Sequence, residues 1–159
     1  MSDLLVKLYN LPPLAPVIEQ QAAQDIRIIR AMSPNKRQVV AWVATHFGEY
    51  WASETDVAFS RSPIGCFIAV EGDKIVGFAC HDTTCKNFFG PTGVHPDYRK
   101  RSIGTALLLA CLHAMRERGY AYAVIGDASS AEYYAKTVGA TIIADSKPSI
   151  YRDLLPLES

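Results

Sequence analysis

The sequence predicts a single α/β domain built on a mixed β-sheet. Two strand-like apolar runs, residues 66–70 and 75–80, are joined by a short polar turn, as in a β-hairpin. An amphipathic helical pattern begins at residue 103, and a near-continuous apolar run at 121–126 follows it. Strands and helices that alternate in this way indicate an α/β architecture.

The composition is that of one ordinary globular domain. The chain has 159 residues, with 16 Lys plus Arg and 16 Asp plus Glu, so its formal net charge is zero. This balance does not support a nucleic-acid partner. We expect no metal site, because the four histidines are scattered and no C-x-x-C pair occurs. We also expect no signal peptide, no membrane span and no membrane partner.

The cysteines indicate a reduced, cytoplasmic protein. Cys66, Cys80 and Cys111 lie inside apolar runs, where a free thiol behaves as a small hydrophobic side chain. We therefore expect core residues rather than a disulfide framework.

We expect the chain to divide into an N-terminal arm, residues 1–25, and a single domain, residues 26–159. The arm begins with an apolar run that predicts a strand or short helix, and then contains three prolines. Its polar end, Gln20 to Gln24, has the composition of a linker. The arm could cover a sheet edge or reach a second subunit.

The domain begins with a predicted strand at Ile26. Ser33 and Pro34 indicate a helix start, and Gly48 its end, with Trp42 and Phe47 expected in the core. A weaker helix follows at 53–60. The hairpin comes next, with Gly72 and Asp73 as its tight turn.

A third strand, 88–94, leads to a proline at position 96. The helix after it has one apolar face and ends near Gly119. Ser129 and Glu132 predict a capping box for a helix that ends at Gly139. A strand at 140–144 and an edge strand at 149–154 complete the prediction.

The stretch YRKRSIGTALL, residues 98–108, predicts an anion site. Three cationic residues precede the start of a helix, where backbone amides lack partners and the dipole favours negative charge. Ser102, Gly104, Thr105 and Ala106 are small enough for a phosphate to approach the backbone. Neither a Walker loop nor a dinucleotide fingerprint is present. The alternatives are a solvated basic turn and a nucleotide-binding domain that uses the same helix terminus.

The longer run GPTGVHPDYRKRSIGTALLLACLHAMRERGY resembles the central acetyl-CoA motif of the Gcn5-related N-acetyltransferase (GNAT) superfamily. In that family a strand ending in V-x-P is followed by R/Q-x-x-G-x-G/A and a long amphipathic helix. The match is residues 99–104, with Ser102 where the family usually has its first glycine. The resemblance runs in order from about Ile26 to the end of the chain.

The resemblance implies a GNAT-like fold: a mixed, mostly antiparallel sheet flanked by helices, with splayed central strands. It implies acetyl-CoA as co-substrate and an N-acetyltransferase acting on a primary amine of a small molecule or peptide, by direct attack in a ternary complex. The alternative is a non-catalytic acyl-CoA-binding module. A homodimer is expected by analogy. The residues implied for binding acetyl-CoA are Thr92, Gly93, Val94, Arg99, Lys100, Arg101, Ser102, Ile103, Gly104 and Thr105.

Acetyl transfer to an amine needs a base, an oxyanion donor and an acid. The family's A-x-x-F-Y segment maps the acid onto Tyr134, although both neighbouring tyrosines could simply pack the helix. The expected oxyanion donor is the Val94 amide. No carboxylate lies on strand 88–94, so His81, beside Asp82, is the nearest candidate base.

Other assignments stay open. His81 and Asp82 could be a polar strand end, and Asp127 and Glu49 are further candidates for the base. In this superfamily the region that contains Tyr50 and Trp51 shapes the acceptor site. Cys111 is a poor nucleophile candidate, because it lies on an apolar helix face.

Overall fold

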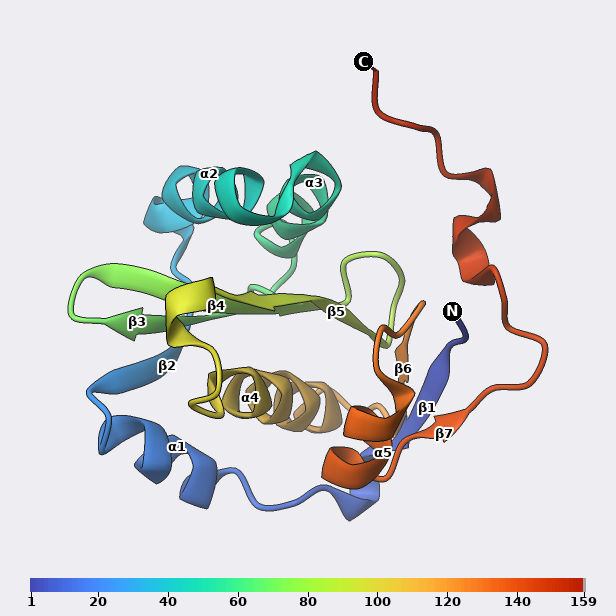
Figure 1. Cartoon of the computed structure of the whole chain (residues 1–159), viewed down its shortest axis with the longest axis horizontal. Helices are drawn as coiled ribbons and strands as arrows, with labels where there is room; N and C mark the ends of the chain where they lie inside the picture. Colours follow the sequence, from blue (N-terminus) through green and yellow to red (C-terminus); the bar gives the residue numbers. More distant parts are fainter. Residues whose placement is uncertain (159) are drawn as a thin grey trace.

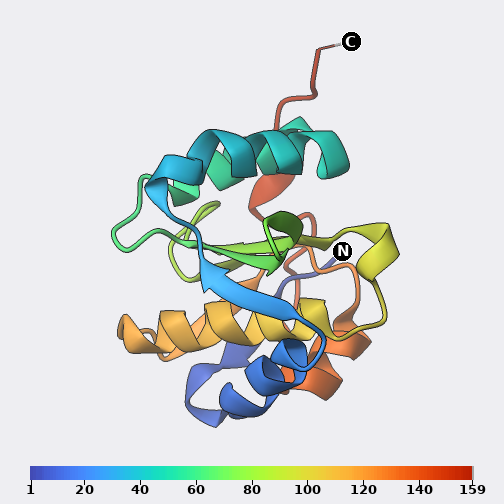
Figure 2. The same ribbon diagram turned by 90° about the vertical axis from the view of Figure 1, so that its left-hand side faces the viewer.

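The computed structural model describes residues 1–158. A seven-stranded sheet of order β2-β3-β4-β5-β6-β1-β7 forms the middle layer, with helices on both faces (Figures 1 and 2). The strands are β1 (Leu4–Lys7), β2 (Ile26–Arg30), β3 (Cys66–Glu71), β4 (Lys74–His81), β5 (Phe88–Val94), β6 (Tyr122–Ile125) and β7 (Thr141–Ile142). The helices are α1 (Ala15–Ala22), α2 (Lys36–Phe47), α3 (Glu49–Ala58), α4 (Ile103–Glu117) and α5 (Ala131–Val138).

Each face of the sheet has its own hydrophobic core. Helix α4 packs against β3, β4 and β5 on one face, and its predicted apolar side is fully buried there. Helices α2 and α3 cover the other face, where Val39 and Val43 meet Phe78 of β4. The β3–β4 hairpin forms as predicted, with Gly72 in the left-handed region that a tight turn requires.

Strands β5 and β6 separate after a short contact. They are parallel and pair only through Phe88 with Val124 and Phe89 with Ile125. Within residues 1–158, the rest of β5 has no strand partner on that side, whereas β4 pairs along its other edge. The splayed strands predicted from the sequence are therefore present, and they open the sheet at its centre.

The segment expected to be an arm contributes regular structure. Strand β1 lies between β6 and β7 and is antiparallel to both, with Leu4 opposite Ile125 and Ile142. Helix α1 runs to Ala22, so the linker-like interpretation of the start of 20–24 is wrong. Residues 20–22 at the end of α1 are too few, and too polar, to show helical periodicity in the sequence. The boundary at residue 25 stays a prediction.

Four local predictions at helix and strand ends are wrong. Residues Ser149–Asp153 form a 3₁₀ helix rather than an edge strand, and the strand expected at 140–144 is only two residues long. Ser130, rather than Ser129, caps α5: its hydroxyl accepts the Tyr133 amide at 3.4 Å. Helix α3 begins at Glu49, directly after the left-handed Gly48, and not at Ser53.

Burial explains the chemistry of the cysteines. Cys66, Cys80 and Cys111 are buried free thiols, as predicted. Burial raises the pKa of the Cys80 and Cys111 thiols well above the ordinary value, so both stay protonated and unreactive near neutral pH. None of the helices within residues 1–158 has the length and hydrophobicity needed to cross a membrane.

Candidate active site

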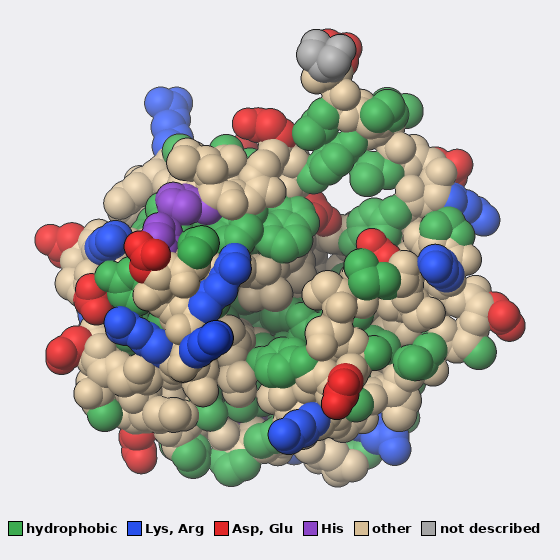
Figure 3. Space-filling model, in the orientation of Figure 1, with side chains coloured by type: hydrophobic (Ala, Val, Ile, Leu, Met, Phe, Trp, Pro, Cys, Tyr) green, Lys and Arg blue, Asp and Glu red, His purple; other side chains and the backbone are tan. Residues whose placement is uncertain are grey.

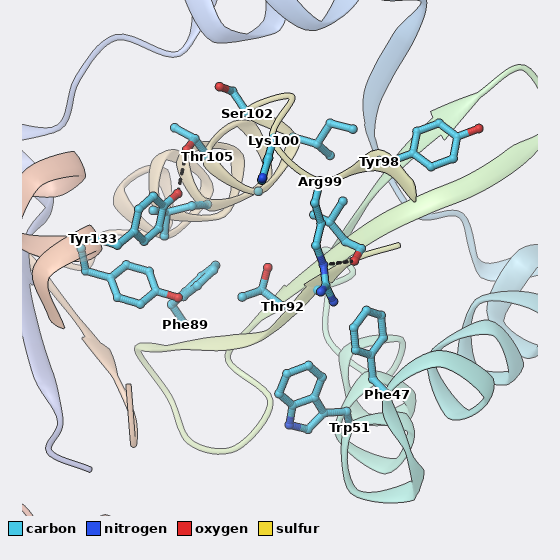
Figure 4. Close-up of a pocket in the computed structure, with 16 residues that line it drawn as sticks. Phe47, Trp51, Phe89, Thr92, Tyr98, Arg99, Lys100, Ser102, Thr105 and Tyr133 are labelled. Carbon is cyan, nitrogen blue, oxygen red and sulfur yellow. Dashed lines mark hydrogen bonds between the residues drawn. The ribbon is translucent and has the colours of Figure 1, made fainter. Parts of the chain in front are cut away.

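A cleft of about 650 Å³ opens where β5 and β6 diverge (Figure 4). Its walls come from β5, the loop that follows it, the first turn of α4, and residues of α2, α3 and α5. The structure brings nearly all the predicted binding residues together here, along with Tyr134: Thr92, Gly93, Val94, Arg99, Lys100, Ser102, Ile103, Gly104 and Thr105. Arg101 does not line the cleft.

The loop before α4 presents a cup of free backbone amides. None of the amides from Lys100 to Thr105 donates a hydrogen bond within residues 1–158. Lys100 and Ser102 both have left-handed backbones, with φ of 64° and 61°. Alternating backbone conformations of this kind turn successive N–H groups toward one point, and the helix dipole adds partial positive charge. The cup can therefore bind an anion.

The open edge of β5 continues from the cup. The His95 amide donates to Val76 on β4 at 2.8 Å, so the backbone groups of the preceding Val94 face the cleft. The Val94 carbonyl accepts the Arg99 Nε–H at 3.3 Å (Figure 4). At Gly93 a Cβ would lie 2.5 Å from the Phe47 ring. Only glycine leaves that ring in place, so Phe47 contributes to the cleft as well as to the core.

The charge around the cup is positive. Arg99 and Lys100 line the cleft, and none of the described residues that line it carries a carboxylate. Figure 3 shows Lys and Arg side chains gathered beside a hollow with hydrophobic walls. The Arg101 guanidinium lies over the Tyr98 ring, 5.0 Å from its centroid, outside the cleft. The Arg101 side chain thus adds to the local potential without lining the cleft.

Tyr134 faces the cleft from α5 and is only 8% exposed. Burial, with a smaller contribution from the neighbouring Tyr133, raises the pKa of Tyr134 to about 12. Its phenol is therefore protonated throughout the physiological range. The Tyr133 hydroxyl shares a hydrogen bond of 2.7 Å with Thr105, which joins α5 to the first turn of α4.

His81 lies outside the cleft. Its side chain is completely buried, and its Nδ1 is 2.6 Å from a carboxylate oxygen of Asp82. The other Asp82 oxygen accepts the Asn87 amide at 2.8 Å. The pair therefore holds the β4–β5 loop, and a buried imidazole cannot meet a substrate in the cleft. The expectation that His81 is the base is corrected on this ground.

Glu54 is a carboxylate that sequence reasoning missed. It lies on α3 one turn after Trp51, which lines the cleft, and it accepts a hydrogen bond from the Thr84 hydroxyl. The adjacent Thr83 hydroxyl donates to the Gly90 carbonyl of β5 at 3.0 Å. Burial raises the pKa of Glu54. No ion pair of Glu54 is found among the described residues.

The other acidic candidates have different surroundings. Glu49 is exposed in the first turn of α3, and the Asp127 amide donates to the Asp3 carboxylate at 2.8 Å. Within residues 1–158, no group of three or more His, Cys, Asp or Glu side chains is arranged to hold a metal ion.

The family follows from a direct comparison. A sequence profile described as the acetyltransferase (GNAT) family matches residues 28–140, which include β5, the cup, α4 and α5. The chain belongs to the GNAT family. No curated protein matches this GNAT chain closely enough to count as a relative.

Solved structures share the GNAT fold at low identity. A Gcn5-related glucosamine N-acetyltransferase region of a fungal multi-domain β-N-acetylglucosaminidase has 13% identity and a TM-score of 0.71, over 89% of this chain and 19% of that one. A GCN5-related N-acetyltransferase from Sphaerobacter thermophilus has 20% identity and a TM-score of 0.62, over 89% and 48%. An aminoglycoside acetyltransferase from an uncultured soil metagenomic sample has 16% identity and a TM-score of 0.51, over 72% of this chain and 88% of that one. The chain thus spans about a fifth of the length of the fungal protein and about half of the length of the Sphaerobacter protein.

The GNAT loop motif explains the strain at Ser102. The family usually has glycine at this position, and here φ is 61°, a conformation that costs a residue with a Cβ about 1–2 kcal/mol. We expect Ser102→Gly to raise the free energy of unfolding by about 0.5–1 kcal/mol, because glycine's greater freedom in the unfolded chain offsets part of the relief. Urea denaturation measures this. Ser102→Ala, which keeps the Cβ, should give no gain, and an equal gain would exclude strain as the cause.

Proposed function

We propose that this GNAT domain is an acetyl-CoA-dependent N-acetyltransferase that acetylates a primary amine of a small molecule or peptide, by direct attack in a ternary complex. The cup of free amides at the end of an open strand edge carries the proposal. A diphosphate fits amides that have no other partner and lie in a cleft that Arg99 and Lys100 also line. Acetyl-CoA would supply the activated acyl group.

The protein's own groups would divide the remaining tasks. The amides from Lys100 to Thr105 would hold the diphosphate, and the free edge of β5 from Thr92 to Val94 would pair with the amides of the pantetheine arm. The oxyanion donor stays predicted at the Val94 amide. Tyr134, protonated and facing the cleft, would donate a proton to the leaving thiolate.

Glu54 replaces His81 as the proposed base. Its half-buried carboxylate accepts the Thr84 hydroxyl one helical turn from the cleft residue Trp51. The adjacent Thr83 donates to Gly90, which follows the cleft residue Phe89 on β5. A carboxylate with a raised pKa is a better proton acceptor than an exposed one, and the aromatic ring of Trp51 suits the apolar part of an amine.

We expect Glu54→Gln to lower kcat/KM for the amine by about a hundredfold. A base acts in its deprotonated form, so the wild-type rate should rise with pH through the raised pKa of Glu54, and the variant should lose that limb of the profile. Steady-state rates across pH measure both effects. Glu49→Gln, on the exposed start of the same helix, is the matched control and should keep the wild-type profile. A pH limb that survives in Glu54→Gln would assign the base elsewhere.

A non-catalytic acyl-CoA-binding module is the second candidate, favoured because no carboxylate lines the cleft within residues 1–158. An acetylation screen with acetyl-CoA against amino sugars, polyamines, amino acids and peptides separates the two. Turnover of any amine supports the enzyme, whereas CoA binding without turnover supports the module. The absence of CoA binding contradicts both. The cytoplasmic location and the homodimer stay predictions.

A further inference from the structure

We propose that helix α1 acts as a clamp on the loop before α4. The side chains of Gln21 and Gln24 fix the Arg101 carbonyl and so aim the Ser102 amide into the cup. The inference rests on the proposed function, because the ligand of the cup is taken to be the diphosphate of CoA. It gives a role to the segment before residue 26, which the family match does not reach.

Two side chains converge on one oxygen. The Gln21 Nε2 donates to the Arg101 carbonyl at 2.9 Å, and the Gln24 Nε2 donates to the same oxygen at 3.2 Å. A carbonyl only accepts hydrogen bonds, so the nitrogen of each amide must face it. Gln21 is fully buried, and α1 packs against α4 beside the loop (Figure 2).

The geometry of the peptide bond transmits this contact to the cup. In a trans peptide the carbonyl of one residue and the N–H of the next point in opposite directions. Holding the Arg101 carbonyl against α1 therefore turns the Ser102 N–H away from α1. Accordingly, Ser102 lines the cleft and Arg101 does not. The left-handed residues Lys100 and Ser102 lie on either side of Arg101, and such backbone persists only where its surroundings hold it.

Packing alone does not account for glutamine at position 21. The Gln21 Oε1 is buried and has no hydrogen-bond partner among the described protein groups. An unpaired buried amide oxygen is unfavourable, and an apolar side chain of similar size would avoid that cost. The feature that glutamine alone provides here is the donor to the loop.

The test compares a ligand that reaches the cup with one that does not. We expect Gln21→Leu to weaken CoA binding about tenfold in calorimetry, and to leave the affinity for pantetheine, which has no phosphate, unchanged in NMR titrations. Gln24→Ala should weaken CoA binding about threefold, because one of two donors remains. Gln20→Leu, on the exposed face of α1, is the matched control and should bind both ligands as wild type does. Melting temperatures should stay within a few degrees.

The outcomes separate the clamp from the proposed function. If the wild-type chain does not bind CoA, both fall. If it binds CoA and Gln21→Leu binds equally well, the clamp falls and the proposed function stands. An equal loss of CoA and pantetheine affinity would indicate general damage and would also overturn the clamp. Should Gln21→Leu fail to fold, Gln21→Met and Gln24→Ala decide the question by the same comparison.

Discussion

Replacing Gly104 by glutamate should abolish CoA binding while the domain stays folded. Gly104 lies in the first turn of α4 and lines the cleft. A carboxylate there would occupy the free amides and repel a diphosphate, and juxtaposed like charges cost several kcal/mol. We therefore expect the affinity for CoA to fall by more than about a hundredfold in calorimetry. Stability should be kept, because an acidic side chain in the first turn favours the helix dipole.

Gly104→Ala is the control that separates charge from volume. A Cβ at position 104 would lie 3.8 Å from the Val94 Cγ2, which is ordinary contact. Binding of CoA by Gly104→Ala should therefore stay close to that of the wild-type chain. Micromolar binding by the glutamate variant would show that the diphosphate does not use this cup, and the proposed function would lose its main support.

Replacing Tyr134 by phenylalanine should reduce kcat by about a hundredfold and leave the KM for acetyl-CoA nearly unchanged. The substitution removes one hydroxyl and keeps the buried ring. Because the pKa of Tyr134 is about 12, the hydroxyl is a neutral donor at every lower pH. The acid is present below that pKa and is lost only above it. Tyr134 should thus add no descending limb to a pH–rate profile between pH 6 and about 10.

Tyr133→Phe is the matched comparison. The Tyr133 hydroxyl bonds Thr105 at the rim of the cup, so its loss should raise KM for acetyl-CoA a few-fold and spare kcat. The two neighbouring tyrosines would then have opposite kinetic effects. A Tyr134→Phe enzyme with the wild-type rate at all pH values would show that the leaving thiolate takes its proton from another donor.

The sequence predicted most reliably the features that depend on neighbouring residues. The apolar face of α4 repeats at helical spacing and is buried along its length. The β3–β4 hairpin could be predicted because its two strands and its turn are contiguous in the sequence. The cap of α5 was misplaced by one residue, because Glu132 completes a capping-box pattern with Ser129, whereas in the fold the Ser130 hydroxyl accepts the Tyr133 amide.

Features that depend on distant residues could not be predicted in this way. The Glu54 carboxylate accepts a hydrogen bond from Thr84, thirty positions away, and nothing in the stretch around Glu54 indicates that contact. Gln21 contacts a carbonyl eighty positions along the chain. From the sequence alone, Gln21 is assigned to a polar linker and Glu54 has no assigned role. The sequence motif located the cup. The residue proposed to hold its loop, Gln21, and the proposed base, Glu54, come from elsewhere in the sequence.

The position of β1 has a consequence for how the chain folds. Residues near position 5 must wait for partners near positions 124 and 141, so the sheet cannot close until most of the chain has left the ribosome. Contacts of such long sequence separation slow folding and leave a growing chain with an unsatisfied strand edge. The edges of β6 and β7 should stay unpaired until β1 enters between them, which makes that insertion a late event in folding.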